Sequence, residues 1–505
     1  MRMLCRILFA ASIVLPSGIA SNAQNPQKIV DQYLRAAGGT KTLSRLQTVT
    51  LEGTIASSST GKSGTYTFIT KSPNRFYSEL IVGDQHFIRS YNGKSPWSQD
   101  ASGDAVTLLG PEALQLAAAA QYYNSHLVNA QKNRFTLTVV GHASVAGHDA
   151  LQVEVILPNH QNRQVFFDAA SHLIVKEVGP LASADQEILY RDYRAVDGVQ
   201  LPHKIELRRG TESYEISVSR AMINAPVRES IFDFPRRSQV HLPDLKALFQ
   251  EINDNQKKID KVREEYASTK IVQEDELDGS GKLKKREVHE YQVFYLKGSE
   301  IRTLIKKNDK PLNEDEQKKE NERVQKHIQE IQSGGGRRAK QEAKRDKTKD
   351  EGKESDDVGI SSVLRACQFV NPRHERFRGQ DVLVFDFERN PDYKPRDLGE
   401  RLLQKLVGVV WIDQQAHDVV RLEAYFSDNF KVGGGLLASL HKGTSFVFEQ
   451  SYINNEVWLP SYEEAHIGVR IALVKSFNVN EITRYSNYKK FNVETLSNTS
   501  LPKSN

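Results

Sequence analysis

The sequence predicts an α+β protein, mainly antiparallel β, built from two tandem copies of one domain that each carry short helices. Runs rich in β-branched and aromatic residues, separated by Gly, Asn, Asp and Pro turns, indicate strands in both halves of the chain. Helical spacing of apolar residues is confined to a few segments. Three sequence matches recur in the same order in the two halves, which is the signature of an internal repeat.

The repeat is carried by short segments that keep their order while the loops between them change length. Residues 147–155 (GHDALQVEV) recur as 379–387 (GQDVLVFDF), and residues 198–202 (GVQLP) recur as 456–460 (EVWLP). Between them, Phe167-Asp168, His172 and Val175-Lys176 recur as Ile412-Asp413, His417 and Val420-Arg421. We therefore expect equivalent strands at these positions.

The chain begins with the residue order of a secretory signal peptide. Arg2 and Arg6 precede an apolar run from Ile7 to Leu15, and small residues lead to a cleavage site near Ala23. We expect residues 1–23 to be removed and the mature protein to be periplasmic and soluble. No later segment has the roughly 18 apolar residues of a membrane-spanning helix. Cys367 is then the only cysteine, so no internal disulfide is expected.

Residues 24–236 are expected to form the first domain. Its opening helix has Ile29, Val30, Tyr33, Leu34 and Ala37 at helical spacing and Gly38-Gly39 as its stop. Strands are predicted at 65–70, 76–82 and 85–91. A second helix is predicted from Pro111 to Tyr123, with proline in the first turn.

Residues 243–493 are expected to form the second domain, and 494–505 a flexible tail. One helical face is formed by Leu245, Leu248, Phe249, Ile252, Ile259, Val262 and Tyr266. Strands are predicted at 287–295 and 300–305, and a short helix at 360–369.

The second domain carries an insertion, residues 313–357, that the first domain lacks. Residues 313–331 predict a charged helix with Asn313 as N-cap and Glu316 three residues later. Residues 333–357 contain almost no apolar side chain, so we expect them to be disordered.

No motif indicates a catalytic site. Gly61-Lys62-Ser63 lacks the glycine-rich loop that cradles a phosphate, because Ala56 stands where the first glycine belongs. The sequence contains no His-Glu-x-x-His, Gly-x-Ser-x-Gly or Cys-x-x-Cys. The formal charge of +5 is small for 505 residues, and acidic residues are interspersed with basic ones. The sequence therefore does not indicate a nucleic-acid-binding surface. We therefore expect neither an enzyme nor a bound cofactor.

Two weaker patterns have structural explanations. Glu276, Asp278, Ser280 and Glu287 occupy oxygen-ligand positions of a calcium loop, but Asp278-Gly279 equally predicts a hairpin turn between strands, which we favour. His172 and His417 are equivalent in the repeat and follow Asp168 and Asp413 at a turn. No nucleophile lies near them in sequence, so a capping or packing role is favoured over catalysis.

Several short motifs of the first domain resemble the LolA/LolB lipoprotein-carrier superfamily. They are Ser72-Pro73-Asn74-Arg75-Phe76 with Glu79, Tyr91-Asn92-Gly93 with Trp97, Phe167-Asp168, Val199-Gln200-Leu201-Pro202 and Phe232-Asp233-Phe234-Pro235. The resemblance covers residues 25–236 and, through the repeat, 245–493 more weakly. It implies a curved antiparallel sheet, an unclosed barrel whose concave apolar face is covered by short helices and holds acyl chains.

The resemblance implies a non-catalytic periplasmic carrier for a lipid or lipidated protein. An alternative is an envelope regulatory or assembly module that binds a protein partner through its curved sheets and the charged insertion. For the first, the residues expected to line an apolar groove are Phe68, Phe76, Leu80, Phe87, Tyr91, Trp97, Leu114 and Ala118. The helix 111–123 contributes Ala117 to Ala120, whose small side chains allow close approach to a sheet or leave space beneath the helix.

Overall fold

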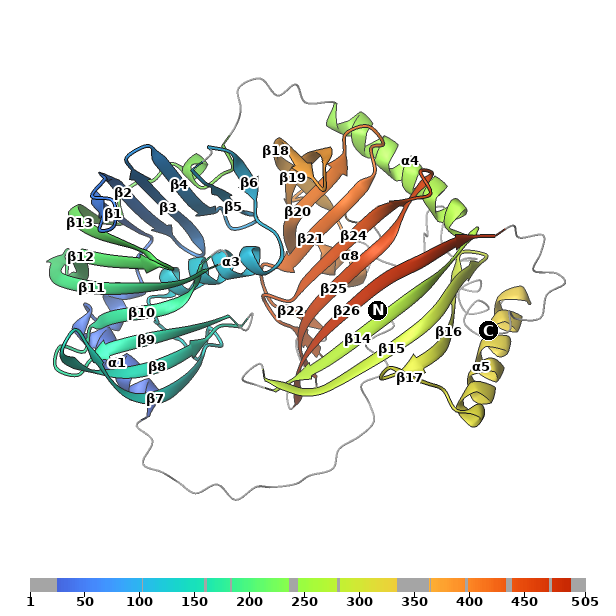
Figure 1. The fold of residues 1–505 in the computed structure, drawn as a ribbon, viewed down its shortest axis with the longest axis horizontal. Coiled ribbons are helices and arrows are strands. Elements are labelled where there is room, and N and C mark those ends of the chain that lie inside the picture. Colours follow the sequence, from blue (N-terminus) through green and yellow to red (C-terminus); the bar gives the residue numbers. More distant parts are fainter. Residues whose placement is uncertain are drawn as a thin grey trace, which may run out of the picture. The chain divides into compact units, whose positions relative to one another are not determined.

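The computed structural model describes residues 25–491, apart from 102, 159–160, 182–183, 236–243, 279–281, 334–362, 364, 396–397, 433–437 and 472–474. The chain divides into two compact units, residues 1–236 and 237–505 (Figure 1). The predicted signal peptide, the tail 494–505 and all but the first residue of the segment 333–357 lie outside the described residues.

The first unit is one antiparallel sheet with helices. Its elements are α1 (Pro26–Ala36), α2 (Thr40–Leu43), β1 (Thr48–Ser57), β2 (Ser63–Lys71), β3 (Arg75–Val82), β4 (Gln85–Tyr91), β5 (Pro96–Gln99), β6 (Ala105–Thr107), α3 (Gly110–Ser125), β7 (Thr136–Val145), β8 (His148–Ile156), β9 (Asn162–Asp168), β10 (Ile174–Leu181), β11 (Ala184–Val196), β12 (Val199–Arg209), β13 (Glu212–Ile223) and η2 (Glu229–Ile231). The sheet order is β6-β5-β4-β3-β2-β1-β13-β12-β11-β10-β9-β8-β7.

The second unit has the same kind of sheet. Its elements are α4 (Leu245–Arg263), β14 (Tyr266–Leu277), β15 (Leu283–Leu296), β16 (Ser299–Lys307), β17 (Lys310–Pro311), α5 (Glu314–Gln332), β18 (Cys367–Phe377), β19 (Gln380–Arg389), α8 (Leu398–Leu403), β20 (Leu406–Asp413), β21 (Val419–Phe426), β22 (Phe430–Val432), β23 (Ala438–Leu440), β24 (Ser445–Ile453), β25 (Val457–Ile471) and β26 (Lys475–Lys490). The main path is β17-β16-β15-β14-β26-β25-β24-β21-β20-β19-β18.

The two sheets follow one topology. In each unit the first strand lies in the middle, beside the last, and the strand that follows the internal helices lies at one edge. The edge strands β6 and β7, and likewise β17 and β18, do not pair with each other within the described residues, so neither sheet closes. The predicted tandem α+β fold with unclosed antiparallel sheets is confirmed.

The repeated Asp and His residues build the same turn in both units. Asp168 Oδ1 accepts hydrogen bonds from the amides of the second and third residues after it, and Asp413 Oδ1 does the same. The amides of His172 and His417 donate to the carbonyls of these aspartates, at 2.9 and 3.0 Å. Both histidines have a positive φ, 59° and 54°. Their equivalence therefore reflects a shared turn between paired strands.

Three of the predicted helices form where the periodicity places them. The Asn25 side chain caps α1, and α3 begins one residue before Pro111. The segment predicted to be helical from Leu245 forms α4, which ends at Arg263. Tyr266, which is predicted on the same helical face, is instead the first residue of β14. The helix predicted at 360–369 is wrong for its last three residues, because Phe369 pairs with Phe387 of β19 in a strand that starts at Cys367.

The charged insertion forms the predicted helix. Asn313 and Glu316 make a reciprocal capping box at the start of α5. Val324 is the one residue of this helix that is buried, and α5 lies against β16. A single buried side chain in 19 residues confirms that this helix is polar nearly all round.

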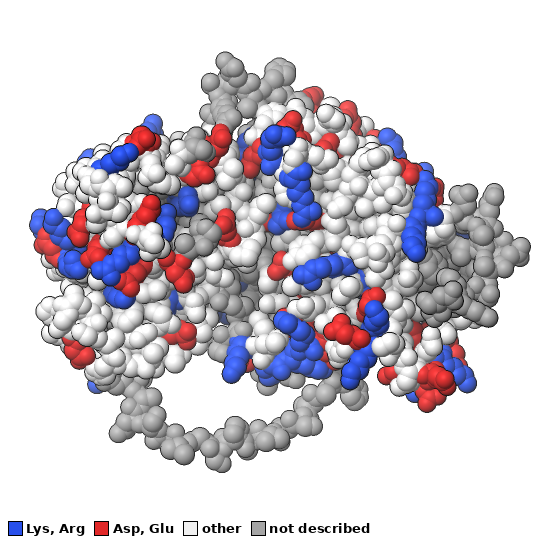
Figure 2. All heavy atoms as spheres, viewed as in Figure 1, with Lys and Arg blue, Asp and Glu red and all other residues white. Residues whose placement is uncertain are grey.

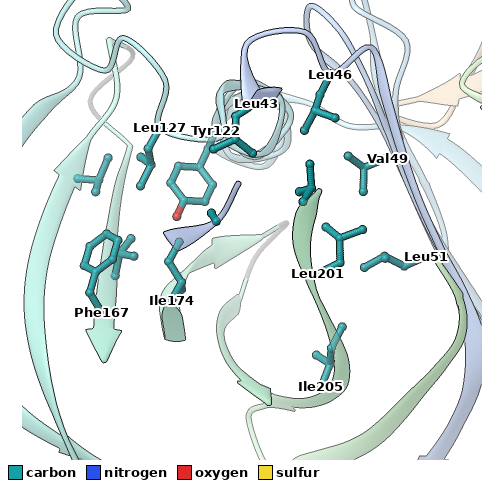
Figure 3. Close-up of a cluster of buried hydrophobic side chains, with 14 of the residues drawn as sticks. Leu43, Leu46, Val49, Leu51, Tyr122, Leu127, Phe167, Ile174, Leu201 and Ile205 are labelled. Atoms are coloured by element: carbon teal, nitrogen blue, oxygen red, sulfur yellow. The ribbon is translucent and has the colours of Figure 1, made fainter. Parts of the chain in front are cut away.

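The core of the first unit lies on the face of the sheet that packs against α1 and α3, which we call the inner face. Figure 3 shows Leu43, Leu46, Val49 and Leu51 pointing toward the same interior as Tyr122, Leu127, Phe167, Ile174, Leu201 and Ile205. We call β1 to β6 one arm of the sheet and β7 to β13 the other. These residues come from both arms, from α2 and α3, and from the loops that follow these two helices. The helices therefore cover a face that is apolar across many strands.

Candidate binding face of the first unit

Five residues predicted to line the groove share the inner face. Strand register places Phe76 opposite Tyr91 and Leu80 opposite Phe87. Phe68 of β2 lies opposite Ser78, between Phe76 and Leu80 in β3, so it points to the same side. The structure thus gathers one aromatic-rich surface from β2, β3 and β4.

Helix α3 covers this surface. The Tyr123 ring contacts Phe68 edge-on and stacks on Phe76, with centroid distances of 5.4 and 5.9 Å. Ala118 belongs to the same core cluster, and Leu114 of the same helix is half-buried. Phe76 and Tyr91 expose only 1% and 2% of their surface. Helix α3 thus covers Phe76 and Tyr91, while Phe68 and Phe87 stay partly exposed.

Trp97 does not belong to this surface. It lies on the outer face of the sheet with Ile69, Tyr77 and Ile88, covered by the segment that ends the first unit. Its Nε1 donates to the carbonyl of Phe232 at 2.9 Å. The sequence motifs at 91–97 and 232–235 thus contact each other, and their shared role is to close the outer face.

A buried charged cluster, which the sequence did not indicate, joins α3 to the sheet. The carboxylate of Glu177 in β10 accepts hydrogen bonds from the hydroxyls of Tyr122 at 2.5 Å and Tyr190 at 3.0 Å. Arg163 of β9 lies 3.8 Å from Glu177, and both side chains are nearly inaccessible, at 6% and 4%. The Arg163 guanidinium also lies over the rings of Tyr122 and Tyr123, at 5.0 and 5.1 Å.

Burial sets the electrostatics of this cluster. Desolvation, with help from Glu177, raises the pKa of Tyr122 well above its ordinary value. Desolvation also raises the pKa of Tyr123 to about 12 although Arg163 opposes the rise. The tyrosines are therefore neutral hydrogen-bond donors, and Arg163 with Glu177 is the ion pair. Such a pair positions α3 on the sheet.

In the second unit the corresponding carboxylate lies on a different strand. A cross-strand row of the first unit runs Val153, Val165, Glu177, Ile188, Leu207. The row on the equivalent strands of the second unit runs Phe385, Val410, Leu422, Phe448, Glu463. The carboxylate thus lies on the third strand of the row in the first unit, β10, and on the fifth strand in the second unit, β25.

The strands around Glu463 carry further polar groups on the same face. Tyr485 donates to Glu463 at 3.1 Å, and Lys270, which lies opposite Tyr485, forms an ion pair with Glu300 at 3.2 Å. Figure 2 shows lysine and arginine side chains lying among aspartate and glutamate side chains on the viewed surface. Polar side chains of β14, β25 and β26 therefore interrupt this face of the second unit.

The calcium-loop pattern lies at a hairpin, as the favoured interpretation expects. Glu276 and Glu287 belong to the paired strands β14 and β15 and form ion pairs with Lys284 and Lys285, each at 3.0 Å. The Asp278 amide donates to the Lys282 carbonyl at 2.9 Å across the turn. Ser280 lies outside the described residues. No group of three or more His, Cys, Asp or Glu side chains suited to a metal occurs in the described parts of the chain.

Comparisons with known proteins find similar structures but no similar sequences. No protein-family model and no curated protein matches the chain. A LolA superfamily protein from Nitrosomonas europaea is 12% identical over 42% of this chain and 99% of its own, with a TM-score of 0.27. An outer membrane lipoprotein-sorting protein domain from Vibrio parahaemolyticus is 12% identical over 40% and 97%, with a TM-score of 0.27.

A third solved structure spans most of the chain. The MucA/MucB complex of Pseudomonas aeruginosa is matched over 92% of this chain and 99% of that one, at 9% identity and a TM-score of 0.18. The solved structures thus include members of the LolA superfamily, the group that the sequence motifs resemble. No helix among the described residues is long and apolar enough to cross a membrane.

Proposed function

We propose that the first unit binds an acyl chain of a lipid or lipidated protein between its inner face and α3, and that the protein is a non-catalytic carrier in the periplasm. One observation carries this proposal: a wide apolar face, formed by strands of both arms, is covered by a helix with four consecutive alanines. Concave apolar sites with few polar groups suit an acyl chain.

The alanines make the proposal testable. Ala118→Phe places a large ring between α3 and the sheet, so it should block uptake of a fluorescent fatty acid while the melting temperature stays near that of the parent. Ala117→Phe is the matched control, because Ala117 lies on the same helix but is less buried than Ala118.

Binding and melting have to be measured together. If α3 never leaves the sheet, Ala118→Phe overpacks a solid core and costs about 1–3 kcal/mol of unfolding free energy. A large drop in melting temperature, with no fatty-acid binding by the parent protein, would refute the proposal.

A second candidate function, binding of an envelope protein partner, is favoured by α5. This helix is held to β16 by Val324, by the Glu320 carboxylate that accepts from the Leu304 amide at 2.7 Å, and by Arg323, which donates to the Arg302 carbonyl at 2.6 Å. Its remaining charged side chains are mostly exposed. Deleting 333–357 should release a partner from the purified complex if this candidate is correct, and leave fatty-acid binding unchanged.

A further inference from the structure

Five arginines that are fully or partly buried differ in what they contact. Arg163, Arg373 and Arg421 each lie within ion-pair distance of a buried carboxylate, that of Glu177, Asp386 or Glu449. A buried cation is costly without such a partner. Arg89 and Arg209 of the first unit are half-buried, and desolvation lowers the pKa of both.

Arg89 and Arg209 contact only neutral groups among the described residues. Arg89 Nη1 donates to the carbonyls of Ile88 and Gln99, at 2.9 and 3.3 Å, and its buried Nε has no partner there. With the amide of the buried Gln186 turned so that its oxygen faces Arg209, that oxygen accepts a hydrogen bond from Arg209 Nε at 2.9 Å. Neither guanidinium group therefore hydrogen-bonds to a carboxylate in the part of the chain that the structure describes.

Strand register places both arginines on the inner face. Arg89 lies between Phe87 and Tyr91 in β4, and Arg209 follows Leu207 on the same side of β12. They come from opposite arms of the sheet, because β3, β2, β1 and β13 lie between their strands. In a flat sheet five strand spacings alone would separate their strands by about 24 Å.

Curvature of the sheet brings the two charges within electrostatic reach of each other. Desolvation lowers the pKa of Arg89 most, and the positive charge of Arg209 lowers it further. Glu112 and Asp100 act in the opposite direction on Arg89, and Tyr214 and Glu212 on Arg209, but none of the three carboxylates lies within ion-pair distance of these arginines. The end of the inner face near the start of α3 thus holds two cations that face an apolar surface.

We propose that Arg89 and Arg209 bind the anionic head group, a carboxylate or a phosphate, of an amphiphile whose acyl chain lies on the inner face of the first unit. This inference rests on the proposed function and names its ligand class. A head-group anion supplies the missing countercharge, and arginine donates paired hydrogen bonds to both anions. Gln186 holds the Arg209 guanidinium in place.

The first test uses the unaltered protein. Hexadecanoate and hexadecanol have the same chain and differ in head-group charge, so titration of the full chain with each isolates the contribution of the arginines. We expect hexadecanoate to bind at least ten times more tightly than hexadecanol. Butyrate, which has the carboxylate but little chain, should not compete at millimolar concentration.

The second test uses matched charge variants. Arg89→Met together with Arg209→Met should lower the affinity for hexadecanoate to that for hexadecanol. Because these arginines give up hydrogen bonds to neutral groups and no ion pair, the melting temperature should fall less than in Arg163→Met. Arg35→Met together with Arg220→Met removes the same charge from exposed positions and should leave both affinities unchanged.

The outcomes separate the two proposals. Equal binding of hexadecanoate and hexadecanol by the unaltered protein would overturn the head-group site and leave the acyl-chain proposal standing. Binding of neither would overturn the proposed function itself. Competition by butyrate as effective as that by hexadecanoate would show that the arginines serve a free anion and not a lipid.

Discussion

The stability that a buried charged residue contributes to this protein depends on whether it is paired with an opposite charge. Arg163 and Glu177 are both almost inaccessible, and Glu177 is also satisfied by tyrosine hydroxyls of α3 and β11. Such a group stabilises the fold only while the whole cluster is intact, because removing one partner leaves an uncompensated buried charge.

Arg163→Met should therefore lower the unfolding free energy by about 3 kcal/mol. Arg194→Met breaks an exposed pair with Asp192, and a loss of no more than about 1 kcal/mol is expected there. Chemical denaturation of both variants gives the comparison. Combining Arg163→Met with Glu177→Gln should recover part of the loss. Equal effects of the two single arginine variants would contradict the account of this cluster.

Asp418 makes stability depend on pH. Burial raises its pKa from 3.8 to about 6, the negative charge of Asp413 adds to the rise, and His417, Lys258 and Asn255 oppose it. Because the folded pKa exceeds the unfolded one, the folded state binds the proton more tightly. The resulting stabilisation is full below the unfolded value and is lost as pH rises through about 6.

Asp418→Asn should accordingly raise the melting temperature at about pH 7.5 and change it little at about pH 4. Asp428→Asn, at a residue whose side chain is 67% exposed, is the control and should show no such gain. A larger gain at the acidic pH than at the neutral pH would show that the sign is wrong.

Residue-level positions were only partly predictable from the sequence. Phe68, Phe76, Leu80, Phe87 and Tyr91 share one face because strands β2 to β4 are long enough for their alternation to fix a side. Strand β5 has four residues, so its alternation could not show that Trp97 points outward. Arg163, Glu177, Arg89 and Arg209 are ordinary charged residues in sequence, and only pairing between distant strands buries them.

At the level of elements, local signals predicted the helices that have their own caps. The capping box of α5 satisfies backbone amides independently of the rest of the fold. The helix prediction at 360–369 is wrong for residues 367–369, because pairing with β19 outweighs the local preference of these residues.

Asn313→Ala should destabilise α5 by about 1 kcal/mol, because the Glu316 amide loses its acceptor. Asn321→Ala lies in the exposed middle of the same helix and should stabilise it by a few tenths of a kcal/mol, since alanine has the higher helix propensity. Amide hydrogen exchange across 314–332 measures both. Faster exchange in both variants, or in neither, would contradict the capping role.

For the whole molecule, the repeat predicted the topology but not how the two units differ. Both sheets use one strand order, and the matched segments lie in β8 and β19, in β9 and β20, and in β12 and β25. The polar groups, however, sit on different strands of the inner faces. Sequence comparison of the copies misses this change, because it depends on which residues share a cross-strand row.

The central claim is that an acyl chain binds between the inner face of the first unit and α3. Photo-crosslinking of the full chain with a hexadecanoate analogue that carries a diazirine at its far end, followed by mass spectrometry of the labelled peptides, tests it most directly. The account predicts label in peptides containing Phe68, Phe76 or α3, and loss of that label in Ala118→Phe. Label confined to the second unit, or to the outer-face residues Trp97 and Phe234, would contradict it.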